Sequence, residues 1–112
     1  MIRSKNSVFV KIKELVKEIP EGKVSTYGNV ARAVGIDNPR VVGWALRGNQ
    51  NKLVPCHRVV KKDGYLATNF SLGGWREQRR RLMKDGVKKI CGQRIDDFEN
   101  IFWDLLVKLK KK

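Results

Sequence analysis

The sequence has few of the residues that build metal sites. Two cysteines and one histidine, Cys56, Cys91 and His57, cannot supply the four Cys or His ligands of a typical structural zinc site. We therefore expect no metal ion and no other cofactor. Two cysteines also do not by themselves indicate a disulfide, because in a reducing cytosol such a pair is more often two thiols. We expect Cys91 to be a structural thiol, whereas Cys56 must be judged by its neighbours.

Long apolar runs are missing as well. No run approaches the ~20 residues that span a bilayer, and the first residues lead into an amphipathic pattern rather than an apolar signal peptide. We therefore expect a monomeric protein without a membrane partner, located in the cytoplasm with the nucleoid, or in the nucleus of a eukaryote. A length of 112 residues predicts one domain over residues 1–112.

Acidic residues are scarce relative to basic ones. Lysine and arginine number 25 against 11 aspartates and glutamates, which gives a formal net charge of +14. An excess of this size and sign suits a polyanionic partner, which makes nucleic acid the first expectation. Charge alone also fits a merely basic protein, so the placement of the charges must decide.

Hydrophobic periodicity predicts a mainly α-helical domain with short strands (α/β). Apolar residues at spacings of three and four predict an amphipathic helix over residues 7–19. A second such helix is predicted over residues 75–84, which contain four arginines and form the most basic face. Its apolar side would hold Trp75, Leu82 and Met83. A final helix is predicted over residues 98–109.

Two short helices between these segments indicate a helix-turn-helix of the winged-helix-like kind. Ser25 or Thr26 can cap the first, which stops at Gly35. Asn38, followed by a proline, can begin the second, which runs to residue 48. The spacing fits an ordinary helical hairpin equally well. Three arginines on these helices favour DNA binding: Arg32, Arg40 and Arg47.

Short strands and a loop complete the predicted fold. Residues 59–60 and 87–90 are strand candidates, and the glycine-rich stretch 65–74 is predicted to be a loop that forms one wall of a binding site.

Cys56 has neighbours that suit a nucleophile. A cysteine attacks as its thiolate, and an adjacent histidine, nearby cations or a helix N-terminus can lower the thiol pKa. Pro55 fixes its own backbone before Cys56, and His57 could accept the thiol proton directly or through water. A Cys-His pair alone is weak evidence, because free cysteine is usually a small buried apolar residue.

The wider sequence around Cys56 resembles a known family. The matching motifs are GKVSTY (22–27), PRVVG (39–43), ALRGN (45–49), VPCHRVV (54–60) and, beyond them, FS (70–71) with GG (73–74). In this order they resemble the O6-alkylguanine-DNA alkyltransferase family over residues 7–90, which leaves 91–112 as a C-terminal extension.

The resemblance implies a single-turnover DNA-repair reaction. Double-stranded DNA with an alkylated guanine would be the partner, and other repair proteins could join it. The thiolate of Cys56 would take the alkyl group from a flipped base, with His57 as the base and Asp85 orienting His57. Ser71 and the backbone at Val59 would line the base pocket.

The resemblance also implies how DNA would be held. Arg40 would intercalate in place of the extruded base, where its planar guanidinium can stack and donate hydrogen bonds. Tyr27 would crowd the 3′ phosphate, and Asn49 would brace the helix-turn-helix beside Cys56. Val41 and Arg47 complete the expected contacts. The family places its recognition helix in the minor groove, so little sequence specificity is expected.

Three departures from the family pattern leave a second function open. Asp85 stands where the family commonly has glutamate, and Leu72 separates Ser71 from the glycine pair. The single-domain architecture and the tail from Gly92 resemble the alkyltransferase-like proteins, which generally carry Trp or Ala in place of the cysteine. Those proteins bind alkylated DNA without repairing it. A lesion-binding protein is therefore the alternative, and a general helix-turn-helix protein is a third.

Overall fold

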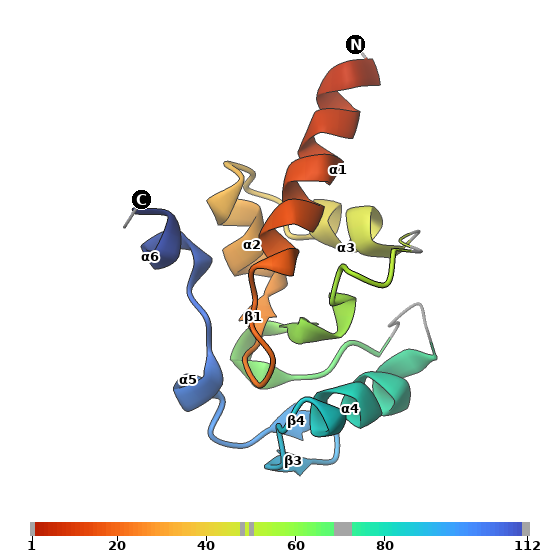
Figure 1. The fold of residues 1–112 in the computed structure, drawn as a ribbon, viewed down its shortest axis with the longest axis vertical. Coiled ribbons are helices and arrows are strands. Elements are labelled where there is room, and N and C mark those ends of the chain that lie inside the picture. Colours follow the sequence, from red (N-terminus) through yellow and green to blue (C-terminus); the bar gives the residue numbers. More distant parts are fainter. Residues whose placement is uncertain (1, 48, 50, 69–72, 111–112) are drawn as a thin grey trace.

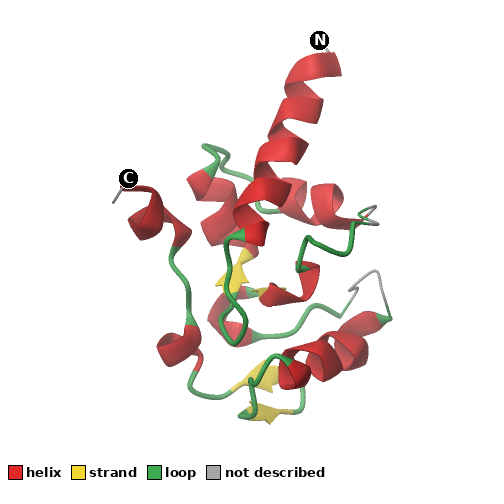
Figure 2. Cartoon of the chain, in the orientation of Figure 1, coloured by secondary structure: helices red, strands yellow, loops and turns green. Residues whose placement is uncertain are grey.

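The computed structural model describes residues 2–47, 49, 51–68 and 73–110. It is mostly helical with short strands, as predicted (Figures 1 and 2). The long helix α1 (Ile2–Lys17) stands against α2 (Tyr27–Ala33) and α3 (Arg40–Arg47), while α4 (Gly74–Lys84) lies at the other end of the molecule. None of the helices in these ranges is long and apolar enough to cross a membrane.

Helices α2 and α3 form the predicted helix-turn-helix, and their ends follow from the capping residues. Thr26 is the N-cap of α2, where its hydroxyl accepts a hydrogen bond from the Asn29 amide at 3.0 Å. Gly35 follows α2 with a φ of +83°, in the left-handed region that glycine tolerates. The Asn38 side chain accepts a hydrogen bond from the Arg40 amide at the start of α3.

Two-residue strands join distant parts of the chain. β1 (Ser25–Thr26) pairs in parallel with β2 (Val59–Val60), so that Ser25 lies opposite Val59. Between α3 and β2 lies the short 3-10 helix η1 (Cys56–Arg58), and η2 (Lys62–Gly64) follows β2. The predicted strand at 59–60 is confirmed. The pairing places the residues after Cys56 beside those before Tyr27.

The C-terminal part departs from the prediction. Residues 98–109 form two helices, α5 (Phe98–Ile101) and α6 (Leu105–Lys110), instead of one. The break has a physical cause: Phe102 forms a parallel bridge with Val24, and the Trp103 amide donates to the Val24 carbonyl at 2.7 Å. The Asp104 carboxylate then accepts hydrogen bonds from the first amides of α6.

Other predicted boundaries shift. α1 begins at Ile2 and ends at Lys17 rather than spanning 7–19. The strand expected at 87–90 is the hairpin of β3 (Ile90–Cys91) and β4 (Arg94–Ile95), and only Ile90 falls in the expected range. Met83 is 41% exposed, so it does not belong to the buried side of α4.

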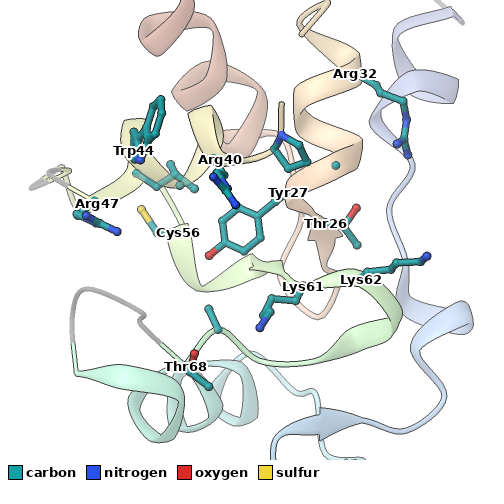
Figure 3. Close-up of a pocket in the computed structure, with 15 residues that line it drawn as sticks. Thr26, Tyr27, Arg32, Arg40, Trp44, Arg47, Cys56, Lys61, Lys62 and Thr68 are labelled. Carbon is teal, nitrogen blue, oxygen red and sulfur yellow. The ribbon is translucent and has the colours of Figure 1, made fainter. Parts of the chain in front are cut away.

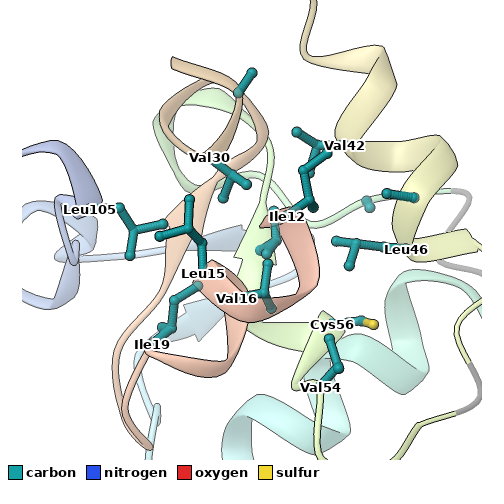
Figure 4. Packing of buried hydrophobic residues seen from close by; sticks show 14 residues of the cluster. Ile12, Leu15, Val16, Ile19, Val30, Val42, Leu46, Val54, Cys56 and Leu105 are labelled. Atoms are coloured by element: carbon teal, nitrogen blue, oxygen red, sulfur yellow. The ribbon is translucent and has the colours of Figure 1, made fainter. Parts of the chain in front are cut away.

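The interior consists of two apolar clusters. The first core lies between α1, α2 and α3 and also takes in Cys56 and Leu105 (Figure 4). The second core lies under α4 and the β3–β4 hairpin and contains Val24, Val60 and Leu82. β1 and β2 run along the boundary, because Val59 belongs to the first core and Val60 to the second. The candidate site lies against the first core, because Leu46, Cys56 and Ala67 belong to this core and also line the cavity described below.

Candidate active site and basic cavity

A cavity of about 880 Å³ opens on the outer side of the helix-turn-helix (Figure 3). One wall comes from α2 and α3, and the opposite wall from the chain after β2. Cys56 lies on the wall between them. The lining residues are Thr26, Tyr27, Gly28, Arg32, Pro39, Arg40, Gly43, Trp44, Leu46, Arg47, Cys56, Lys61, Lys62, Ala67 and Thr68.

Cys56 begins η1 directly after Pro55 and is only 7% exposed. Its sulfur accepts a hydrogen bond from the side-chain amide of Asn49 at 3.3 Å. Burial raises the pKa of the Cys56 thiol above its ordinary value, although the Asn49 hydrogen bond and the charges of Lys13 and Arg81 act in the opposite direction. The thiol is therefore protonated at neutral pH and needs a base before it can attack.

Asn49 is held in place by the loop that follows α3. Its amide nitrogen donates to the Asn51 carbonyl at 3.0 Å, and its side-chain oxygen accepts from the Asn51 amide at 3.2 Å. Together with the bond to Cys56, both the nitrogen and the oxygen of the Asn49 side chain are hydrogen-bonded, and the residue is only 8% exposed. The structure thus places Asn49 beside Cys56, as expected, although not on the cavity wall.

His57 and Asp85 form a direct pair. The His57 Nε2 atom lies 2.8 Å from the Asp85 carboxylate. Burial lowers the pKa of His57, and the Asp85 contact only partly offsets this, so the ring is neutral near pH 7. Because an ionised carboxylate can only accept, the proton of the neutral ring is on Nε2, which leaves Nδ1 as a proton acceptor. A base with a free acceptor therefore follows Cys56 directly in the chain.

Asp85 also binds Arg58, which the sequence reasoning did not single out. The Arg58 guanidinium donates to the Asp85 carboxylate at 2.8 and 3.3 Å and to the Ile19 carbonyl at 2.9 Å. Burial raises the pKa of Asp85, but the hydrogen bonds from Arg58 and His57 outweigh it, so the pKa is lowered. The carboxylate is thus ionised and joins the end of α4 to η1, and Arg58 extends this link to Ile19, two residues after α1.

Tyr27 lies at the first position of α2, on the cavity wall close to Cys56 (Figure 3). Burial, together with the charge of the nearby Cys56, raises the pKa of Tyr27 to about 12. The phenol therefore keeps its proton at neutral pH and can donate a hydrogen bond into the cavity.

Five cations line the cavity, and all five are exposed. Three of them, Arg32, Arg40 and Arg47, are the arginines that the sequence favoured for DNA binding. Lys61 and Lys62 on the opposite wall were not predicted, because nothing in a two-lysine turn signals which cavity it faces. Within the described ranges, no ion pair within 4.0 Å involves any of these cations.

Two other expected residues stand apart from the cavity. Val41 is half-buried and packs against the first core. Val59 is fully buried, does not line the cavity, and its carbonyl accepts a hydrogen bond from Gln78 at 2.9 Å. Ser71 lies outside the described residues. Of the loop predicted as a binding-site wall, Ala67 and Thr68 do line the cavity.

Gln78 of α4 is a supporting residue that the sequence did not reveal. It is fully buried, its oxygen accepts from the Ala67 amide at 2.8 Å, and its nitrogen donates to the His57 and Val59 carbonyls. It thereby fixes both the segment after Cys56 and the cavity wall at Ala67. A glutamine on an arginine-rich helix gives no sequence signal of such a role.

The prediction that Cys91 is a structural thiol is wrong. Cys91 is exposed on β3, so it is not a structural thiol packed in the core, and both cysteines are free. Among the residues that the structure describes, no group of three or more His, Cys, Asp or Glu side chains is placed to hold a metal ion.

Comparison with known proteins identifies the family. Residues 7–87 match the family model described as 6-O-methylguanine DNA methyltransferase, DNA binding domain. The chain therefore belongs to this family of DNA-repair alkyltransferases. The matched segment contains Tyr27, Arg40, Cys56 and Asp85.

Individual relatives carry two kinds of name. A bifunctional methyltransferase/endonuclease of Thermoplasma volcanium is 40% identical over 78% of this chain, which spans only 27% of that protein. A methylated-DNA–protein-cysteine methyltransferase of Methanopyrus kandleri is 47% identical over 63% of this chain and 51% of its own length. The structure of an alkyltransferase-like protein of Schizosaccharomyces pombe, in complex with damaged DNA containing O6-carboxymethylguanine, superposes with a TM-score of 0.78 at 32% identity. That likeness covers 88% of this chain and 95% of the other.

Proposed function

We propose that this chain binds duplex DNA containing an O6-alkylated guanine and transfers the alkyl group irreversibly to Cys56. The observation that carries the proposal is the position of the Cys56 thiol on the wall of a cationic cavity large enough for a nucleobase. A base with a free acceptor nitrogen, His57, comes directly after it. Members of the family with the transferase name supply the reaction class.

The proposed step is a direct displacement. His57 takes the thiol proton, through a water molecule, on Nδ1, and Asp85 stabilises the resulting imidazolium. The Cys56 sulfur forms a bond to the alkyl carbon while the bond from that carbon to guanine O6 breaks. The electron pair goes to the guanine, which accepts a proton. We assign Tyr27, whose phenol stays protonated at neutral pH, as the donor of this proton. The phenolate then regains a proton through solvent from the His57 imidazolium, so that both side chains return to their neutral forms. The thioether on Cys56 is stable, so each molecule reacts once.

DNA binding would use the cationic side of the cavity. Arg40 and Arg47, about two turns apart on α3, carry charges that no carboxylate neutralises within the described ranges. We assign Arg40 to the space that the flipped base leaves and Tyr27 to the phosphate beside it, because both side chains line the cavity that would receive the base.

A second function has an observation of its own. Burial holds the Cys56 pKa above its ordinary value, so the thiolate is a minor form at neutral pH. The likeness to the alkyltransferase-like structure also extends over nearly the whole of that chain. Both fit a protein that holds the alkylated base beside an unreactive thiol and leaves its removal to other repair proteins.

Mass spectrometry separates the two functions. The protein is incubated with a duplex containing O6-methylguanine, at a concentration where binding is complete, and the peptide containing Cys56 is weighed. Transfer adds one methyl group to this peptide in the natural chain and in Cys91→Ser, and adds nothing in Cys56→Ser. Full binding of the lesion with an unmodified Cys56 would establish the lesion-binding function instead.

A further inference from the structure

The outer face of α3 combines two charges with an aromatic ring. Arg40, Trp44 and Arg47 recur at spacings of four and three, which places them on one side of the helix. All three line the cavity, as does Gly43, beside which a Cβ atom would meet nothing within 4 Å. The opposite side of α3 is buried through Val42, Ala45 and Leu46. The face is thus a ring between two guanidinium groups, with open space at the glycine.

Trp44 differs from the other two tryptophans. Trp75 is half-buried against the second core and Trp103 against the first. Trp44 is 53% exposed and belongs to neither core. In Figure 3 its ring extends from α3 at the edge of the cavity, on the side away from Lys61 and Lys62. When a flat apolar partner covers an indole that is exposed to water, the free energy falls, because apolar surface is removed from water.

The surroundings of Trp44 indicate a nucleobase as this partner. Among the described residues, the side chains that line the cavity include five cations and no carboxylate, so the site favours a polyanion. Aromatic rings interleaved with basic side chains are typical of surfaces that stack unpaired bases. A protein partner that covered the ring would instead have to cover the two arginines as well.

We propose that Trp44 is a base-contacting wedge, which inserts its indole against a base step beside the nucleotide held in the cavity. This inference rests on the proposed binding of alkylated duplex DNA. Apolar side chains that insert at a base step partly unstack it, and unstacking is easiest where pairing is already weakened. Trp44 would therefore give the chain a preference for locally destabilised duplexes, whether or not a base is alkylated.

The test measures binding and base stacking together. Three fluorescently labelled duplexes are compared by anisotropy: one with O6-methylguanine, one with an unmodified mismatch and one fully paired. A second set carries 2-aminopurine next to the central position, because its fluorescence rises when it unstacks. The variants are Trp44→Ala, which removes the ring, and Trp44→Phe, which keeps an aromatic ring. Leu53→Ala is the control, since Leu53 is 75% exposed and does not line the cavity.

We expect Trp44→Ala to weaken binding to the O6-methylguanine and mismatched duplexes about ten-fold, with a smaller loss on the paired duplex. The 2-aminopurine signal should fall with Trp44→Ala and remain with Trp44→Phe. Leu53→Ala should match the natural chain in both measurements. Equal affinity and an unchanged 2-aminopurine signal for Trp44→Ala would overturn the wedge, and would leave a protein surface as the use of Trp44.

The outcomes for the wedge and for alkyl transfer are distinguishable. The mismatched duplex has no alkyl group, so a Trp44 effect on it holds even if Cys56 never becomes methylated. Conversely, methylation of Cys56 with an unchanged signal in Trp44→Ala would retain the proposed reaction and remove the wedge.

Discussion

The two halves of the molecule, one built on the first core with α3 and the other on the second core with α4, carry their positive charge in different ways. On α4, Glu77 accepts hydrogen bonds from Arg80 and Arg81 at 2.6 to 2.9 Å, and these bonds lower the pKa of Glu77 to about 2. On α3, Arg40 and Arg47 have no carboxylate within 4.0 Å in the described part of the chain. The sequence makes α4 the more basic helix, but its charge is partly neutralised.

The difference teaches that charge density along a sequence does not predict which charges remain for a ligand. An arginine three or four residues from a glutamate on one helix face pairs with it, as Arg80 and Arg81 do. The cavity collects cations from three separate segments of the chain, namely α2, α3 and the residues after β2, none of them as basic as α4. Substitutions can test whether the arginines of α3 contribute more to DNA binding than those of α4, and how much the contacts of Asp85 and Asn29 stabilise the fold.

Loss of the Asp85 carboxylate should have the largest effect, because it joins the halves. Asp85→Ala leaves Arg58 without its anion, although Arg58 is only 17% exposed, and removes the partner of His57. Breaking a buried pair in this way costs about 3 kcal/mol. Urea denaturation should show this loss, while Asp37→Ala, at an exposed bend, should change stability little.

The same pair predicts a pH dependence. The pKa of Asp85 is lowered in the folded protein, so its contribution to stability is fully present above the unfolded value of about 3.9. It is lost as pH falls through the lower folded value. Near pH 6 the contact with Asp85, which raises the pKa of His57, adds to the stability difference between the natural chain and Asp85→Ala as the ring becomes protonated. Below about pH 4 this difference should shrink, and a difference that still grows there would contradict the pairing.

Asn29 should have the next largest effect. This buried side chain accepts from the Ser25 hydroxyl and the Leu105 amide and donates to Asp104 at 2.9 Å. Asn29→Ala would take this acceptor from the Ser25 hydroxyl and the Leu105 amide and remove one of the donors to Asp104, at a cost of about 2 kcal/mol. Because Asn29 lies two residues from Tyr27, lesion binding should weaken as well. Thermal unfolding and anisotropy measure the two effects, with the exposed Asn100→Ala as control.

Replacing single arginines compares the two helices directly. Arg40→Ala should reduce affinity for an O6-methylguanine duplex at least ten-fold, because a cavity cation without a carboxylate partner is lost. Arg80→Ala, on the exposed side of α4, should change it less than two-fold. Anisotropy titrations at several salt concentrations are the measurement. Similar losses for the two variants would mean that the neutralised helix also contacts DNA.

Glu77→Gln should have the smallest effect and the opposite sign. It removes the negative charge that now offsets Arg80 and Arg81, so affinity for plain duplex DNA at low salt should rise about two- to three-fold. The increase should vanish at high salt, and the preference for alkylated over plain DNA should fall. An unchanged affinity would show that α4 lies away from the bound duplex.

Much of the helix-turn-helix could be predicted from local signals. The Thr26 and Asn38 caps act within three residues, and the structure has both. The motif order identified the family, which the match over residues 7–87 confirms. It also singled out Cys56, His57, Asp85 and Asn49, which the fold brings together, although their chemical roles remain predictions.

The features that sequence reasoning missed depend on distant partners. Arg58 has an ordinary local pattern, yet it binds Asp85 and Ile19, which lie far away in the chain. The pairing of β1 with β2 involves two residues on each side, too few for a periodic signal. The break in the last helix follows from the bridge between Phe102 and Val24, which are 78 residues apart in the sequence. None of these is encoded in a local window.

The packing of Leu105 has a consequence for how the protein folds during synthesis. Leu105 is buried in the first core among residues of α1 and α2, so this core lacks one of its members until residue 105 has left the ribosome. The hydrogen bonds that join the Asn29 side chain to Asp104 and to the Leu105 amide likewise cannot form before these two residues are synthesised. A nascent chain that ends near residue 87 would hold every motif of the family match and still have an incomplete interior.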